Sequence, residues 1–388
     1  MRKILYAVFL FGCCASLLSG CIKEKYTVPS EKGDALVQLN IGTRAVEETD
    51  GIPTNNETVL HSLRVYAFVD GQPAGHFYTK DGLDVNNPSF LMHLTMYSTM
   101  TQKVDFYVVA NEAAMETPGS SVLLTENTTE TQLNHFTFTK LNTSKGLPMF
   151  CKQTETIDLT QLSDKTPADP GHAGHTLLRQ DLTFELKRPI GKLGVFAAKP
   201  VGENSSLRVT GLTVLASGTR TRNYLMPQTD ETLKAITGIT GDISLEVVEE
   251  EVTKTLAENA SQTDKENPAN YTPVLNESFY LFENPWGSTS WDVKGDNDGN
   301  VLRVDYEFDG NARSGFVYMP PIERNKYYTV CCLMHNDGKI TVEYKVADWN
   351  KENYNITFDY PSYDNPIAPW VGSSLPEGGK YPQPEVYY

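Results

Sequence analysis

Two short segments carry side chains that could bind a metal ion. The first is "HAGH" (172–175), in which His172 and His175 lie in a glycine-rich stretch without a nearby cluster of cysteines or carboxylates. Zinc sites in proteins take three or four protein ligands. We therefore expect this pair to lie in a surface connection and to hold no metal.

The second segment is "DNDGN" (296–300). Asp296, Asp298 and Asn300 match the first, third and fifth positions of a calcium-binding loop, and Glu307 matches the twelfth. The sixth position is Val301, where such a loop needs glycine, and the residues that follow have the pattern of a strand instead of a helix. Asp, Asn and Gly also favour β-turns, so a turn is predicted here.

The sequence excludes several classes of function. It contains no G-x-S-x-G nucleophile elbow, no phosphate-binding loop and no dinucleotide-binding glycine motif. A formal net charge of −16 argues against nucleic acid as a partner, because phosphate binding needs a basic surface. Paired carboxylates for glycoside hydrolysis stay an alternative, since acidic residues are plentiful. We predict that the protein is not an enzyme and needs no metal or cofactor.

The start of the chain predicts export and lipidation. Arg2 and Lys3 precede an apolar run that ends in "LSGC" (18–21), which resembles the lipobox of bacterial lipoproteins. We expect residues 1–20 to be a signal peptide and Cys21 to carry palmitate-type acyl chains. The precursor would then be a lipoprotein of the outer membrane or cell surface. A plain signal peptide followed by a chance cysteine is the alternative.

Three other cysteines would stay in the exported chain: Cys151, Cys331 and Cys332. An odd number cannot pair completely, and adjacent cysteines rarely bridge each other because the geometry is strained. Neighbours in a strand point to opposite faces. We therefore expect buried thiols.

Strand-like segments rich in Val, Ile, Thr, Tyr and Phe recur along the chain, and no long window has the 3.6-residue period of a helix. Short helices are possible near residues 160–162 and within residues 245–259. The pattern predicts an all-β protein. The strand candidates are residues 62–70, 103–111, 135–141, 181–186, 192–198, 207–216, 301–310, 326–334 and 339–349.

A stretch rich in Pro, Gly and Asp, "DKTPADPGHAGHT" (164–176), divides these candidates into two groups. We predict two β-sandwich domains, over residues 45–178 and 179–360. Residues 361–388 combine prolines with aromatic residues, which predicts an extended tail, because proline cannot donate to a strand ladder.

The segment "ALVQLNIGTRAVEE" (35–48) suggests a different kind of chemistry. Val37, Leu39 and Ile41 alternate with polar or small residues, as in a half-buried strand. Arg44 and Ala45 follow, and then an acidic, turn-rich run. The segment is either an edge strand of the fold or a strand that a protease removes.

Several phrases add a resemblance to these observations. They are "VDFYVVANEA" (104–113), "GLPMF" (146–150), "FELKRPIGKLGVF" (184–196), "NYLMP" (223–227), "SFYLFENP" (278–285), "ERNKYYTV" (323–330) and "VADWN" (346–350). In type and order they resemble the fimbrillins, the lipoprotein-derived subunits of type V pili. Together with the lipobox, they cover most of residues 60–350.

The resemblance implies two transthyretin-like β-sandwiches in tandem and no catalytic residues. It also implies that an arginine-specific protease cuts between Arg44 and Ala45 and removes residues 21–44, so that subunits can exchange strands. Another pilus subunit would then replace Val37, Leu39 and Ile41 with a strand of its own. The implied function is that of a structural subunit of a cell-surface pilus, or fimbria, which supports adhesion.

Alternatives stay open. A pilus anchor would keep its lipid and its first strand, and a tip subunit would usually carry a further ligand-binding domain. A surface lipoprotein that binds glycans through Trp286, Trp291 or Trp370 belongs to a different class, because exposed aromatic rings can stack on sugars.

Overall fold

The structure is a computed structural model of the chain. It describes residues 32–42, 57, 59–81, 83, 89–97, 101–117, 124–158, 176–178, 182, 184, 186–236, 238–287, 299–336, 340–349 and 355–357.

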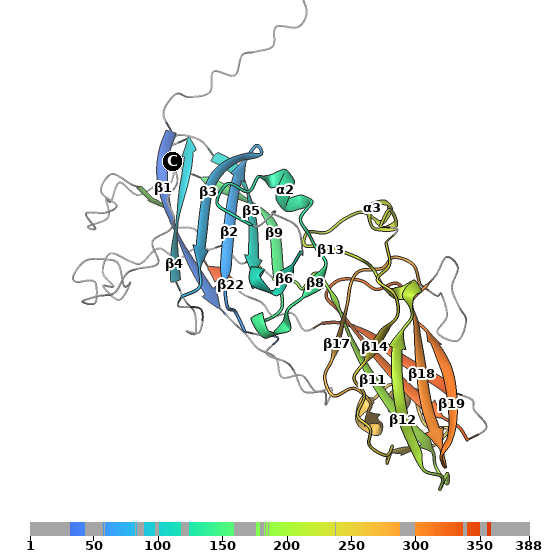
Figure 1. Cartoon of the computed structure of the whole chain (residues 1–388). Coiled ribbons are helices and arrows are strands. Elements are labelled where there is room, and N and C mark those ends of the chain that lie inside the picture. The colour runs from blue at the N-terminus through green and yellow to red at the C-terminus, as the bar shows by residue number, and fades with distance from the viewer. Residues whose placement is uncertain are drawn as a thin grey trace, which may run out of the picture.

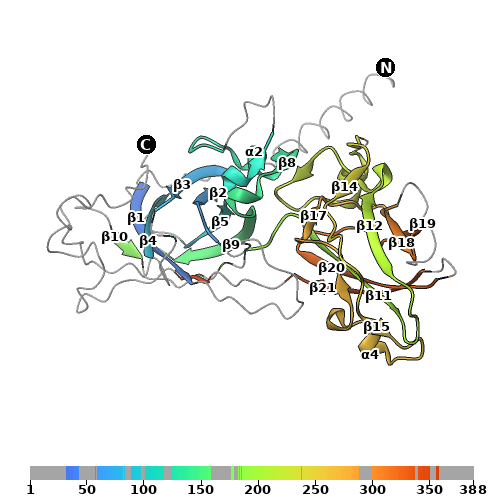
Figure 2. The same cartoon turned by 60° about the horizontal axis from the view of Figure 1, so that its bottom comes forward.

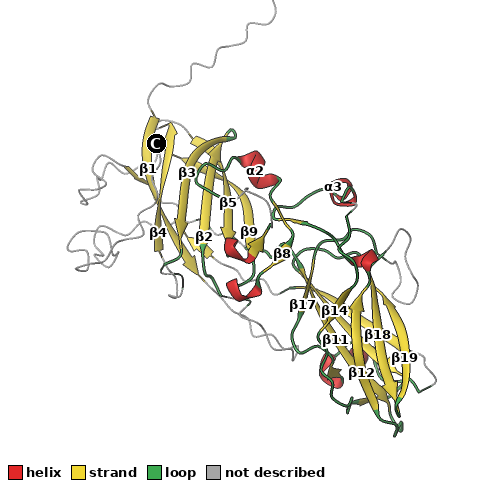
Figure 3. Cartoon of the chain, in the orientation of Figure 1, coloured by secondary structure: helices red, strands yellow, loops and turns green. Residues whose placement is uncertain are grey.

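β-strands dominate the described residues (Figures 1 and 3), which confirms the predicted all-β class. The larger sheets pack around two separate cores, one in the N-terminal half of the chain and one in the C-terminal half. The predicted domain limits and the transthyretin-like topology stay predictions.

The N-terminal core lies between two sheets. In one, β1 (Lys32–Gly42) pairs with β4 (Ser89–Tyr97), β10 (Thr176–Leu178) and β22 (Asn355–Thr357). The other has the order β3-β2-β5-β9, with the bounds Gln72–Thr79, Leu63–Val69, Thr101–Ala110 and Met149–Asp158. Alternate residues of β5, among them Phe106 and Val108, point into this core. Leu182, Phe184 and Leu186 also belong to it, and the Phe184 ring lies 5.5 Å from that of Phe106.

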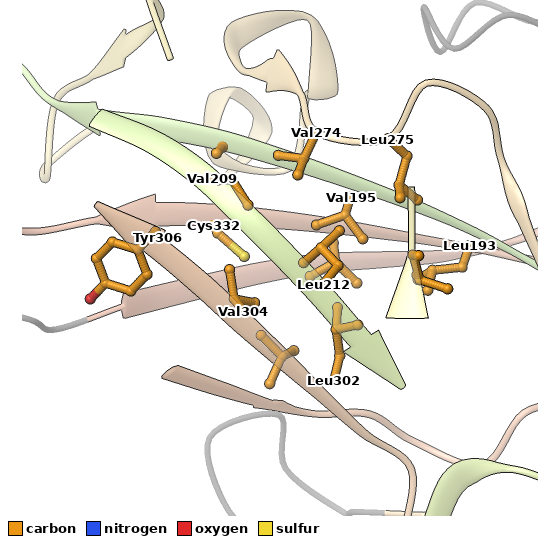
Figure 4. Close-up of a cluster of buried hydrophobic side chains, with 14 of the residues drawn as sticks. Leu193, Val195, Val209, Leu212, Val274, Leu275, Leu302, Val304, Tyr306 and Cys332 are labelled. Atoms are coloured by element: carbon orange, nitrogen blue, oxygen red, sulfur yellow. The ribbon is translucent and has the colours of Figure 1, made fainter. Parts of the chain in front are cut away.

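The C-terminal core lies between two further sheets (Figure 4). One has the order β15-β11-β20-β21, with the bounds Thr255–Leu256, Gly191–Pro200, Lys326–Met334 and Ile340–Asp348, and β16 (Thr272–Pro273) and β17 (Phe279–Leu281) also pair with β11. The other has the order β14-β12-β18-β19, with the bounds Ile243–Leu245, Leu207–Val214, Val301–Phe308 and Asn311–Tyr318. Both faces of β11 and β20 are buried, which explains their nearly continuous apolar sequences.

The remaining elements are short. β6 (Met115–Glu116) pairs with β8 (Lys140–Leu141), and β7 (Thr137–Phe138) pairs with β13 (Asn223–Tyr224). The helices are α2 (Glu130–Asn134), α3 (Asp230–Lys234) and α4 (Gln262–Lys265), with 3₁₀ turns at Glu112–Ala114, Thr143–Lys145, Ala216–Gly218 and Pro268–Asn270. Among the described residues, no helix is long and apolar enough to cross a membrane.

The structure corrects some predicted elements. A helix within residues 245–259 is wrong, since this segment holds the end of β14 and the short β15. Residues 135–141 form the separate strands β7 and β8 instead of one strand. Residues 160–162 lie outside the described part of the chain.

Cys151, Cys331 and Cys332 are buried, as predicted. Cys332 belongs to the C-terminal core, whereas Cys331 packs on the opposite face of β20. Burial raises the pKa of the Cys332 thiol to about 12, so this sulfur is protonated and unreactive at neutral pH.

Arg64 of β2 and His76 of β3 lie on the face of their sheet that is turned away from the N-terminal core. The Arg64 guanidinium donates to both carboxylate oxygens of Glu112, at 2.6 and 3.0 Å, and its Nη1 lies 2.9 Å from His76 Nε2. Because a guanidinium can only donate, Nε2 accepts, and the imidazole is neutral. Burial, and then the charge of Arg64, lower the pKa of His76 to about 4.

This lowered pKa predicts acid sensitivity. Between about pH 6.5 and pH 4 the unfolded chain binds a proton at His76 that the folded chain rejects, so stability is full above this range and falls as the pH drops through it. The loss should reach up to about 3 kcal/mol. Urea unfolding at pH 7 and pH 4.5 should show a smaller loss for His76→Gln than for the wild type. An equal loss in both proteins would contradict the prediction.

Candidate functional site

β1 is the candidate functional element, and it lies inside its sheet with partners on both sides (Figures 1 and 2). On one side it pairs antiparallel with β4 over residues 32–40. On the other side β10 pairs in parallel with residues 35–37, and β22 pairs antiparallel with residues 40–42.

These partners come from distant parts of the sequence. In sequence, β10 comes after β9, and β22 comes after β21, the last strand of the C-terminal half. β1 is therefore the strand that joins β4, β10 and β22 into a single sheet, because none of the three pairs with another of them.

Removal of β1 would have two physical consequences. The backbone groups of β4 that face β1 would lose their partners, and each hydrogen bond contributes about 0.5–1.5 kcal/mol net. The core would also lose cover near Met92 and Leu94 of β4, which are fully buried. An unpaired ladder beside apolar side chains is a template for a strand from another chain.

The structure places the predicted strand-exchange residues on this strand. Val37 lies opposite Met92, Leu39 opposite Phe90, and Ile41 opposite Ile356 of β22. Cys21, Arg44 and Ala45 lie outside the described residues, so lipidation and cleavage there stay predictions.

Most of the other candidates from the sequence cannot be placed relative to one another, because they fall outside the described ranges. His172, His175, Asp296, Asp298, Trp291 and Trp370 lie outside the described residues. Asn300 is buried, and its Nδ2 donates to the carbonyl oxygens of Trp286 and Pro320, at 2.7 and 2.8 Å. Trp286 is half-buried, with Lys234 Nζ 5.3 Å from its ring. In the described part of the chain, no group of three or more His, Cys, Asp or Glu residues could hold a metal ion.

A polar cluster around the buried Glu57 joins the two halves of the chain. The Glu57 carboxylate accepts from Lys192 Nζ at 3.2 Å, from the Tyr280 hydroxyl at 2.7 Å and from Trp349 Nε1 at 3.3 Å. Its main-chain oxygen accepts from Arg188 Nη2 at 3.1 Å. We call these five residues the Glu57 cluster.

Arg324 forms a second junction. It is paired with the Glu283 carboxylate, and it donates to the carbonyl oxygens of Leu225 at 2.9 Å and Met226 at 3.2 Å. The side chains of Leu225 and Met226 in turn pack with Tyr66, Phe68, Tyr107, Phe136 and Phe150, on the outer face of the β2-β5 sheet. Arg324 therefore fixes a C-terminal segment that covers the N-terminal half.

The phrases that carry the resemblance meet at these junctions. Arg188 and Lys192 come from "FELKRPIGKLGVF", Tyr280 and Glu283 from "SFYLFENP", Arg324 from "ERNKYYTV" and Trp349 from "VADWN". Trp349 is 2% exposed, so the last of these phrases supplies a large buried side chain. Sequence reasoning missed Glu57, because the polar run around it gives no local signal of burial.

Comparison with known proteins finds similar solved structures at low sequence identity. No model of a protein family matches the sequence, and neither does any curated protein. The tip fimbrial protein Mfa3 from Porphyromonas gingivalis, with a C-terminal truncation, is 15% identical at a TM-score of 0.44, and the match covers 82% of this chain and 100% of that one. A fimbrilin (FimA) from the same organism is 11% identical at a TM-score of 0.46, over 82% of this chain and 98% of that one. A fimbrial assembly protein from Parabacteroides distasonis is 13% identical at a TM-score of 0.42, over 84% and 99%.

Proposed function

We propose that this chain is a structural subunit of a cell-surface pilus, built by strand exchange after a protease removes its first strand. The observation that carries the proposal is the position of β1, which is the first described strand and the one that holds β4, β10 and β22 together. After a single cut beyond β1, departure of this strand would expose both the backbone ladder of β4 and the core beneath it.

The sequence supplies the rest of the proposal. The lipobox at Cys21 would deliver the precursor to the outer membrane as a lipoprotein, and Arg44-Ala45 follows the end of β1 at Gly42. Cleavage there by an arginine-specific protease would detach residues 21–44 together with the lipid. The partners would be other pilus subunits, each of which inserts a strand in the place of β1.

The cleavage step is tested by the Arg44→Ala variant. Filament incorporation should fall to background, while the free energy of unfolding stays within about 0.5 kcal/mol of the wild type, as for a substitution that breaks no packing. Isolated filaments of the wild type should give Ala45 as the N-terminal residue. The matched control is Arg222→Ala, which removes an exposed arginine from the C-terminal half and should leave incorporation unchanged.

Two outcomes would contradict the proposal. Normal incorporation of Arg44→Ala would show that assembly does not depend on this cut. Filaments in which the protein begins at lipidated Cys21 would identify a pilus anchor that retains its first strand.

A further inference from the structure

Glu57 connects the segment that follows β1 to the C-terminal half. β1 ends at Gly42, and Glu57 is the next described residue along the chain. The described partners of its carboxylate are Lys192, Tyr280 and Trp349, which all belong to the C-terminal half.

The Glu57 cluster holds a buried ion pair between Glu57 and Lys192. Glu57 and Lys192 have side chains that are 2% and 1% exposed, so neither charge can be satisfied by water. Arg188 lies 4.4 Å from the centre of the Trp349 ring and Lys192 lies 5.7 Å from it, which places two cations around one indole beside the Glu57 carboxylate. Displacement of Glu57 would leave the buried Lys192 without its carboxylate, so the cluster favours one placement of the two halves.

The cluster matters most when β1 is absent. β22 follows the C-terminal half and reaches the N-terminal sheet through its pairing with β1. Departure of β1 would remove this link, whereas the Glu57 cluster lies downstream of Arg44 and would stay in the shortened chain.

We propose that Glu57 is a positioning residue for strand exchange, which holds the chain beyond the cut on the C-terminal half so that both halves keep their arrangement when β1 leaves. The inference rests on the proposed function, because it concerns the shortened subunit.

The test measures the distance between the halves in the full chain. Spin labels on the exposed sites Asn127→Cys and Thr210→Cys report one half each. A recognition site for an unrelated protease, inserted after Arg44, makes removal of β1 independent of the natural protease. With Glu57 unchanged, the distance distribution should keep its width after the cut. With Glu57→Gln, it should become at least twofold wider after the cut.

Two further variants distinguish the positioning role of Glu57 from a general loss of stability. Glu250→Gln neutralises an exposed carboxylate and should behave as the unchanged chain does. Glu57→Gln combined with Lys192→Met removes both buried charges. After the cut, its distance distribution should be narrower than that of Glu57→Gln alone. If the distance distribution of the Glu57→Gln chain kept its width after the cut, Glu57 would not be a positioning residue and the inference would be overturned. Failure of Arg44 cleavage in cells would instead refute the proposed function and leave this measurement valid.

Discussion

An Arg324→Ala variant is expected to lose about 3–5 kcal/mol of the free energy of unfolding, as when one partner of a buried ion pair is removed. The variant would leave Glu283, whose side chain is 8% exposed, without its cation. It would also remove the donors to the carbonyl oxygens of Leu225 and Met226, so the segment that covers the outer face of the N-terminal half would be released. Urea unfolding, followed by tryptophan fluorescence, measures the loss.

Two control variants define the cause. Arg324→Lys keeps the charge but cannot reproduce the planar fork of the guanidinium, so an intermediate loss is expected. Arg303→Ala breaks an ion pair with Asp305 whose arginine is 47% exposed, and surface pairs contribute only about 0–1 kcal/mol. If Arg324→Ala and Arg303→Ala lost similar free energies of unfolding, the Arg324 junction would contribute no more than a surface ion pair.

A chain from which residues 21–44 have been removed is expected to bind a synthetic peptide with the sequence of β1, "KGDALVQLNIG" (32–42). The peptide would restore the pairing with β4 and cover Met92 and Leu94. At a concentration of 100 times its Kd it should stabilise the chain by about 2.7 kcal/mol. Thermal unfolding at increasing peptide concentration measures this effect.

The control for this prediction is a peptide of the same composition in scrambled order, which breaks the alternation of Val37, Leu39 and Ile41. The uncut chain is a second control, since β1 already occupies the place. A scrambled peptide that stabilises the shortened chain equally would contradict a specific acceptor site.

Much of the fold is readable from the sequence where side chains alone decide it. Residues 192–198 and 326–334 are nearly continuous apolar runs because β11 and β20 are buried on both faces. β4 and β9 were not among the strand candidates, because His93, Thr95, Gln153 and Thr154 interrupt their apolar patterns. Short strands such as β15 and β16 depend on their partner strand β11, and their two residues are too few to carry a pattern.

The candidate site also has a part that the sequence predicts and a part that depends on distant partners. The alternation in residues 35–41 predicts a strand, but its interior position depends on β10 and β22, which each span three residues far along the chain. Glu57 depends on partners 135, 223 and 292 residues away in sequence. No local pattern can report such contacts.

The antiparallel register of β1 on β4 has a mechanical consequence. Hydrogen bonds of an antiparallel pair run perpendicular to the strands, and here the paired segment extends over residues 32–40. A strand in the place of β1 that is pulled along its own axis would load these bonds in shear, all at the same time, instead of unzipping them one after another. A filament joined through this place would therefore resist tension along the strand far better than a force that peels the strand from one end.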